Sequence, residues 1–179
     1  MNTPNKLTIA RMILVPFFVL FILTGWGGDA NRYICLAIFV VASITDWFDG
    51  HLARKNNLVT NFGKFMDPLA DKLLVCSALI CLLSNGLIST VVVLIIIARE
   101  FIISGFRLVA VDNGIVIAAS WWGKAKTISQ MIMIILLIAN FGGVFDILET
   151  AFIYIAVVLT VISLVDYIWK NRAVLNEQK

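Results

Sequence analysis

The sequence predicts an all-α integral membrane protein with six transmembrane helices and both termini in the cytosol. Its 179 residues are 61% apolar and 14% charged, whereas a typical soluble domain is nearer half apolar and a quarter charged. The apolar residues come in blocks of roughly 20, the length of helix that crosses a hydrocarbon core about 30 Å thick. No Pro-, Gly- or Ser-rich linker divides the chain, so residues 1–179 are expected to form a single membrane domain.

Six apolar blocks define the expected helices. The first covers residues 7–23, contains Pro16, where we expect a kink, and lacks the small-x-small site that would follow a signal peptide. The later blocks cover residues 32–54, 67–83, 87–111, 121–140 and 147–169. Turns rich in Gly and Asn, at residues 25–28, 84–86 and 141–143, separate several of these blocks and are typical helix terminators.

Basic residues gather at one set of predicted helix ends. They are Lys6, Arg11, Arg54, Lys55, Lys64, Lys72, Arg107, Lys124, Lys126, Lys170, Arg172 and Lys179. The opposite ends carry Arg32 together with Asp29, Asp146 and Glu149. Because Lys and Arg accumulate in cytosolic loops, this asymmetry places both termini in the cytosol. The expected location of this multi-pass protein is the plasma membrane. The net charge of +3 is modest, and no nucleic-acid partner is expected.

Four aspartates form two stripes on neighbouring predicted helices. Asp46 and Asp49 share one helix face with Gly50 and Ala53, because these positions follow an i, i+3, i+4, i+7 pattern. Gly63, Asp67 and Asp71 follow at four-residue spacing, which is again one face. The small side chains on these faces would let a helix or a ligand approach the backbone closely.

Such a group of carboxylates near lipid is unfavourable unless a cation neutralises it. Their hard oxygen ligands suit Mg²⁺ or Mn²⁺. About 13 residues of the second predicted helix precede Asp46, roughly 20 Å of helical rise, so the site is expected at the cytosolic headgroup level. The alternative is that the aspartates are solvated charges at helix ends, but ionisable residues in membrane helices are usually functional.

The aspartates belong to a longer pattern with fixed spacing. Written out, it is Asp46-x₂-Asp49-Gly50-x₂-Ala53-Arg54-x₈-Gly63-x₃-Asp67-x₃-Asp71. This pattern resembles the full signature of the CDP-alcohol phosphotransferase family, with every fixed position occupied. Within that family, two further segments are similar to the phosphatidylglycerophosphate synthase branch: Pro4-Asn5-x-Leu7-Thr8-x₂-Arg11 and Gly123-Lys124-x-Lys126-Thr127.

The resemblance implies an enzyme with a cytosol-facing active site. It would transfer a phosphatidyl group from CDP-diacylglycerol to sn-glycerol 3-phosphate, giving phosphatidylglycerophosphate and CMP. It further implies two ions of Mg²⁺ or Mn²⁺, held by Asp46, Asp49, Asp67 and Asp71, with Asp71 also acting as the general base. Members of this family are commonly homodimers surrounded by membrane lipids.

The resemblance also implies which residues bind the CDP-lipid. They are Asn5, Thr8, Gly50, Ala53, Arg54 and Gly63. Gly50 and Ala53 would leave room for the nucleotide, and Arg54 would contact its phosphates. The alternative for Gly50 and Ala53 is plain helix packing, and for Arg54 it is anchoring at the membrane interface.

A phosphorylated acceptor would need its own cationic pocket. The candidates are Lys64, Arg107, Lys124, Lys126 and Arg99. Arg99 lies about 12 Å deeper than Arg107 on the same predicted helix. The alternative is that Arg99 and Glu100 form a buried structural charge pair that involves helices three to five. The alternative for Lys124 and Lys126 is membrane topology alone.

Two rival functions remain open at this point. A sister phosphotransferase would use inositol phosphate, serine or phosphatidylglycerol as acceptor, and the aspartates cannot separate these because they serve the shared donor. A divalent-cation transporter is the rival of another class. Its site would be expected near the membrane midplane among discontinuous helices, whereas these aspartates sit at one edge.

Overall fold

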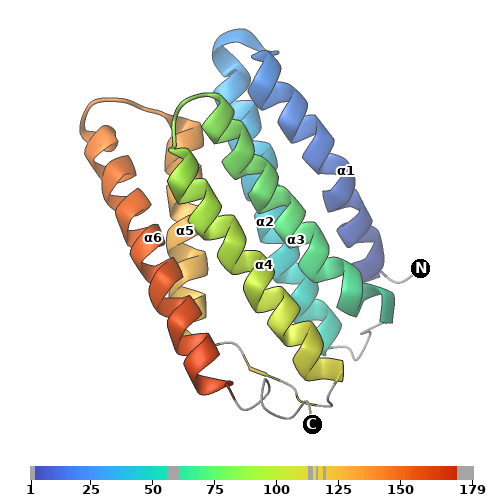
Figure 1. Ribbon diagram of the computed structural model, residues 1–179. Coiled ribbons are helices and arrows are strands. Elements are labelled where there is room, and N and C mark those ends of the chain that lie inside the picture. Colours follow the sequence, from blue (N-terminus) through green and yellow to red (C-terminus); the bar gives the residue numbers. More distant parts are fainter. Residues whose placement is uncertain (1–2, 56–60, 113–114, 116, 119, 173–179) are drawn as a thin grey trace. The chain divides into compact units, whose positions relative to one another are not determined.

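A computed structural model describes residues 3–55, 61–112, 115, 117–118 and 120–172; within the helices, the side chains of residues 3–7, 46–55, 61–65, 67–68 and 112 lie outside this description. The described residues form six α-helices and one short 3-10 helix, with no β-strand among them (Figure 1). The elements are α1 (Thr3–Thr24), η1 (Gly28–Ala30), α2 (Asn31–Lys55), α3 (Asn61–Ser84), α4 (Thr90–Asp112), α5 (Trp121–Ala139) and α6 (Val144–Lys170). The all-α prediction is thus confirmed for this part of the chain.

The helices match the six predicted blocks, with one informative difference. α3 begins at Asn61, six residues before the predicted start at Asp67, so Gly63 and Lys64 belong to a helix. At its other end, the Gly86 N–H donates to the Leu83 carbonyl and the Leu87 N–H to the Leu82 carbonyl, both at 3.0 Å. Gly86 takes a φ of 73°, the left-handed conformation that closes many helices.

The chain divides into two compact units, and the first consists of Met1–Ile88 and Leu137–Asn140. In this unit α1 packs against both α2 and α3. Phe18 of α1 and Phe39 of α2 are fully buried, with ring centroids 6.0 Å apart. The beginning of α1, the end of α2 and the beginning of α3 lie at the same end of this unit (Figure 1). The two halves of the aspartate pattern are therefore carried by helix segments at one end of one unit.

The second unit consists of Ser89–Leu136 and Phe141–Lys179, and in it α4 packs against α6. Its buried residues include apolar side chains such as Ile96 on α4 and Met133 on α5. They also include charged and polar side chains. Those of this unit are Arg99, Lys126, Ser129, Gln130, Thr160 and Ser163. Burying so many polar groups costs free energy unless they bond to one another, so their partners matter.

Three segments of the described chain are long and apolar enough to cross a membrane: Gly28–Thr45, Trp121–Ala139 and Val144–Lys170. Large apolar side chains on them face outward, and Ile147 of α6 is 72% exposed. A helix with such an apolar exterior is typical of membrane spans, because lipid replaces water as the solvent. α4 carries Arg99, Glu100 and Arg107, and these charges keep it outside this group. The prediction of six spans stays a prediction, as do the expected kink at Pro16 and the single domain.

Candidate active site

The aspartate pattern lies on α2 and α3 of the first unit. Asp46 and Asp49 occupy the last ten residues of α2, and Asp67 and Asp71 lie in the first half of α3. Both segments have the helical backbone that places residues three and four apart on one face. The side chains of Asp46, Asp49 and Asp67 lie outside the described residues, and that of Asp71 is partly buried.

The donor set of the predicted metal site is made of carboxylate oxygens, which are the ligands that hard divalent cations prefer. Among the side chains that the structure describes, no group of three His, Cys, Asp or Glu comes together elsewhere. The residues of the aspartate pattern therefore remain the metal candidates, and their chemistry fits Mg²⁺ or Mn²⁺.

Most of the predicted CDP-lipid residues also lie on these helices. Gly50, Ala53 and Arg54 belong to α2, Gly63 to α3, and Asn5 and Thr8 to α1. Of their side chains the structure describes that of Thr8, which is 1% exposed. A hydroxyl so fully buried needs partners within the protein, and Thr8 has one.

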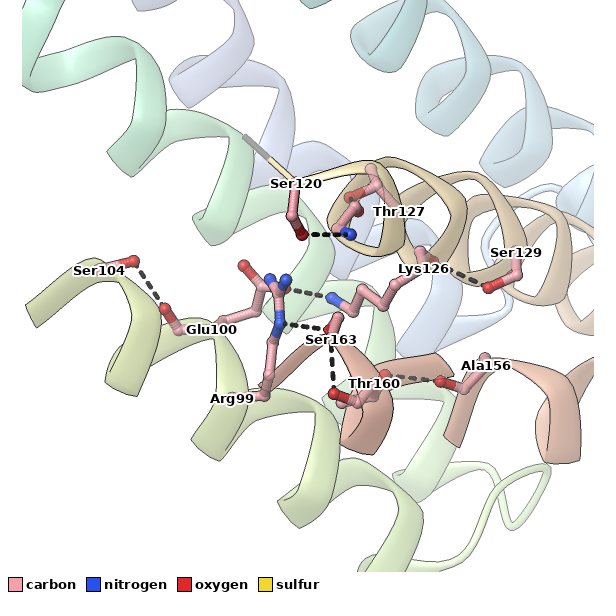
Figure 2. A network of polar contacts seen from close by, with 11 residues as sticks. Arg99, Glu100, Ser104, Ser120, Lys126, Thr127, Ser129, Ala156, Thr160 and Ser163 are labelled. Carbon is pink, nitrogen blue, oxygen red and sulfur yellow. Dashed lines mark hydrogen bonds and ion pairs between the residues drawn. The ribbon is translucent and has the colours of Figure 1, made fainter. Parts of the chain in front are cut away.

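A second polar cluster, which we call the Glu100 cluster, joins three helices of the second unit. It consists of Arg99 and Glu100 on α4, Lys126 on α5 and Ser163 on α6 (Figure 2). Arg99 Nη1 lies 3.2 Å from Glu100 Oε1, Lys126 Nζ forms an ion pair with the same oxygen, and Arg99 Nε donates to Ser163 Oγ at 3.1 Å. Two of the predicted acceptor residues, Arg99 and Lys126, are thus brought together through one carboxylate.

The other predicted acceptor residues have different surroundings. Lys124 and Arg107 are exposed, and the Arg107 guanidinium lies 5.8 Å from the ring centroid of Tyr167. The Lys64 side chain lies outside the described residues.

Comparison with known proteins decides the family. A family model described as CDP-alcohol phosphatidyltransferase matches residues 1–162, most of the chain. The chain belongs to the CDP-alcohol phosphatidyltransferase family. This confirms the resemblance seen in the aspartate pattern, and the family requires a divalent metal ion.

Individual relatives of this phosphatidyltransferase match it over most of their own length. A CDP-diacylglycerol–glycerol-3-phosphate 3-phosphatidyltransferase of Bacillus subtilis is 44% identical, over 95% of each chain. A protein of the same name from Haemophilus influenzae is 39% identical, over 93% of this chain and 91% of its own. A probable phosphatidylglycerophosphate synthase of Mycobacterium tuberculosis is 42% identical, over 93% of this chain and 80% of its own.

The structure shows contacts, not predicted from the sequence, that position helix segments carrying predicted site residues. Arg11 was expected as a topological charge and as the last residue of the segment Pro4-Asn5-x-Leu7-Thr8-x₂-Arg11, but not as a buried residue. It is 1% exposed, and its Nε donates to the Ala42 carbonyl at 3.2 Å. Ala42 lies four residues, about one turn, before Asp46 on α2. The spacing of Thr8 and Arg11, three residues apart on one helix face, was the available signal. Arg11 thus fastens α1 to the part of α2 that leads into the aspartates.

Ser120 is a further residue that the sequence analysis did not single out. Its Oγ accepts a hydrogen bond from the Gly123 N–H at 3.1 Å, which makes Ser120 the N-cap of α5. The cap fixes where α5 begins, and with it the positions of Lys124 and Lys126. A Ser directly before the first helical residue was the signal in the sequence.

Proposed function

We propose that this protein transfers a phosphatidyl group from CDP-diacylglycerol to sn-glycerol 3-phosphate, giving phosphatidylglycerophosphate and CMP. The observation that carries the proposal is the match to relatives named for this reaction, which extends over nearly the whole chain at about 40% identity. The complete aspartate pattern supports the shared donor chemistry, and the second unit supplies cations for a phosphorylated acceptor.

On the donor side, Asp46, Asp49, Asp67 and Asp71 would hold two ions of Mg²⁺ or Mn²⁺. When bound, such ions neutralise charge on a pyrophosphate and make its phosphorus easier to attack. Asn5, Thr8 and Gly63 would line the place of the CDP-lipid, and Gly50 and Ala53 would let the nucleotide approach α2. Arg54 would contact the phosphates, because a guanidinium can donate two parallel hydrogen bonds to them.

The transfer itself exchanges one P–O bond for another. The primary hydroxyl of glycerol 3-phosphate attacks the phosphorus that carries the diacylglycerol, and the bond from that phosphorus to the CMP oxygen breaks. Asp71 takes the proton of the attacking hydroxyl, and CMP leaves with the electron pair of the broken bond. A carboxylate is a weak base, so the effectiveness of Asp71 depends on its proximity to the hydroxyl.

On the acceptor side, the phosphate group of glycerol 3-phosphate is a dianion and needs several cationic donors. We assign this role to Arg99, Arg107, Lys124 and Lys126 of the second unit, with Lys64 of α3. Arg99 and Lys126 are buried, where electrostatic interactions are less screened than at an exposed surface.

The topology proposed with this function has six spans, both termini in the cytosol and the active site facing the cytosol of a plasma-membrane enzyme. It is supported by the basic residues at one set of helix ends and by the apolar exteriors of the helices. The enzyme would act as a single membrane domain and, by family analogy, as a homodimer.

The test is an acceptor panel with the purified protein in detergent. CMP release from CDP-diacylglycerol is measured with glycerol 3-phosphate, inositol phosphate, serine or phosphatidylglycerol, each with Mg²⁺ or Mn²⁺. We expect turnover with glycerol 3-phosphate alone. Turnover only with another acceptor would refute the proposed acceptor and leave the family assignment in place.

A further inference from the structure

Glu100 lies between two of the cations that the proposed function assigns to the acceptor phosphate. The side chains of Arg99, Lys126 and Glu100 are 9%, 2% and 18% exposed, so the three charges share one largely buried place in the second unit. They come from α4 and α5, and Ser163 adds α6 to the cluster (Figure 2). The reaction described above gives Arg99 and Lys126 a task but leaves Glu100 without one.

Stability of the fold does not by itself explain a buried group of this kind. Replacing buried ion pairs by apolar residues of similar volume is often neutral or stabilising. Within a membrane region, ionisable side chains are costly and usually functional. α5 and α6 are otherwise rich in apolar residues, so apolar packing at these positions was chemically available. The Glu100 cluster is therefore better explained by what it holds in place.

The guanidinium of Arg99 is fixed at two of its three nitrogens and open at the third. Nε donates to Ser163 and Nη1 to Glu100, while Nη2 has no hydrogen-bond partner within the described residues. Nη2 lies 3.5 Å from the place that a Cβ would take on Gly123. Gly123 is the third residue of α5, so this open donor lies at the positive end of a helix, where an anion is stabilised.

We propose that Glu100 is a positioning residue for the acceptor phosphate. Its carboxylate holds Lys126 and Arg99 in place, so that Arg99 Nη2 and the start of α5 receive the phosphate without first being ordered. Long Lys and Arg side chains lose much rotamer freedom when they are fixed. If that loss has already occurred in the free enzyme, it does not weaken binding. The inference rests on the proposed function, since it takes glycerol 3-phosphate as the acceptor.

The test compares Glu100→Gln, which keeps the size of the side chain and loses its charge, with Glu100→Asp, which keeps the charge. We expect Glu100→Gln to raise the KM for glycerol 3-phosphate roughly tenfold, the effect of losing one charge-assisted interaction. The kcat and the KM for CDP-diacylglycerol should stay within about twofold, because the donor does not bind through this residue. Glu100→Asp should recover most of the acceptor KM.

Asp166→Asn is the matched control, because Asp166 forms an ion pair with Lys170 at 2.7 Å in the same unit but outside the Glu100 cluster. It should leave both KM values unchanged. Calorimetric titration with glycerol 3-phosphate, in the absence of donor, should show the same loss of affinity in Glu100→Gln as the KM does. A purely structural role for Glu100 would lower the thermal unfolding midpoint without moving the acceptor KM.

The proposal is overturned if the KM of Glu100→Gln for glycerol 3-phosphate stays within about twofold of the parent value. It is also overturned if the KM for CDP-diacylglycerol rises as much as the KM for glycerol 3-phosphate. If Glu100→Gln does not fold, Ser163→Ala replaces it, because this substitution leaves the three charges in place and removes the Nε partner of Arg99, together with the hydrogen bond from Ser163 Oγ to the Thr160 carbonyl. It should raise the acceptor KM about threefold, and no rise overturns the proposal. Absence of glycerol-3-phosphate turnover in the unsubstituted protein overturns the proposed function itself, and the inference with it.

Discussion

Lys126→Met tests how strongly the Glu100 cluster couples α4 to α5. The substitution keeps a long unbranched side chain but removes the ammonium group of a side chain that is 2% exposed, and Glu100 loses its ion pair with Lys126. Breaking a buried ion pair by removing one partner costs about 3–5 kcal/mol. Arg99 still contacts Glu100 at 3.2 Å, so we expect a loss near the lower end, about 3 kcal/mol, in the free energy of unfolding.

The assay is denaturant unfolding in detergent micelles, followed by helical circular dichroism. The double variant Lys126→Met/Glu100→Gln removes both charges of this ion pair, and its loss should be smaller than the sum of the losses in the two single variants, because coupled neighbours are not additive. Lys124→Met is the matched control: Lys124 is exposed on the same helix, and its removal should change stability by less than about 0.5 kcal/mol. Equal losses of stability in Lys124→Met and Lys126→Met would refute the coupling of α4 to α5 through the Glu100 cluster. A loss in the double variant equal to the sum of the two single losses would refute it as well.

Three further stability predictions use the same unfolding measurement. Ser120→Ala removes the N-cap hydrogen bond of α5 and should cost about 1 kcal/mol, whereas Ser120→Asp should retain the stability. Phe39→Ala empties a fully buried position and should cost about 3–5 kcal/mol; a loss below that range would contradict its place in the core. Gly86→Ala should cost about 1–2 kcal/mol because Gly86 has a left-handed φ of 73°. Gly105 lies within α4, and a Cβ added there would face open space, so Gly105→Ala should raise the free energy of unfolding by up to about 1 kcal/mol. Stability changes of the same sign in Gly86→Ala and Gly105→Ala would contradict the conformations assigned to the two glycines.

The helices could be predicted from the sequence because each one is a long apolar block ended by turn residues. The start of α3 could not. Residues 61–66 mix polar, small and apolar side chains, and a helix that continues beyond an apolar block leaves no mark in the hydropathy. The consequence matters for the site, since this extra segment carries Gly63 and Lys64.

The aspartates could be found because their chemistry depends on local spacing along helices. The Glu100 cluster depends instead on pairing between distant residues: Lys126 lies 26 positions from Glu100, and Ser163 lies 64 from Arg99. The alternative interpretation of Arg99 and Glu100 from the sequence was a buried charge pair that involves helices three to five. The structure confirms the pair and its contact with the fifth helix, and it adds the sixth through Ser163.

Arg11 and Lys126 were missed as buried residues for a common reason. A basic residue at a helix end fits the positive-inside pattern, so neither residue was expected to be buried. Burial was decided by the packing partner, which for Arg11 is the Ala42 carbonyl 31 positions away. A count of charges along the sequence does not reveal such a partner.

The most direct test of the account is glycerol-3-phosphate-dependent CMP release by Asp67→Ala, compared with the parent and with Asp166→Asn at saturating Mg²⁺ or Mn²⁺. We predict activity in the parent and in Asp166→Asn that a chelator abolishes and added metal restores, and none above background in Asp67→Ala. Asp67→Ala should still fold, as its thermal unfolding midpoint would show. Activity that persists in folded Asp67→Ala would contradict the assignment of the aspartates as the metal site.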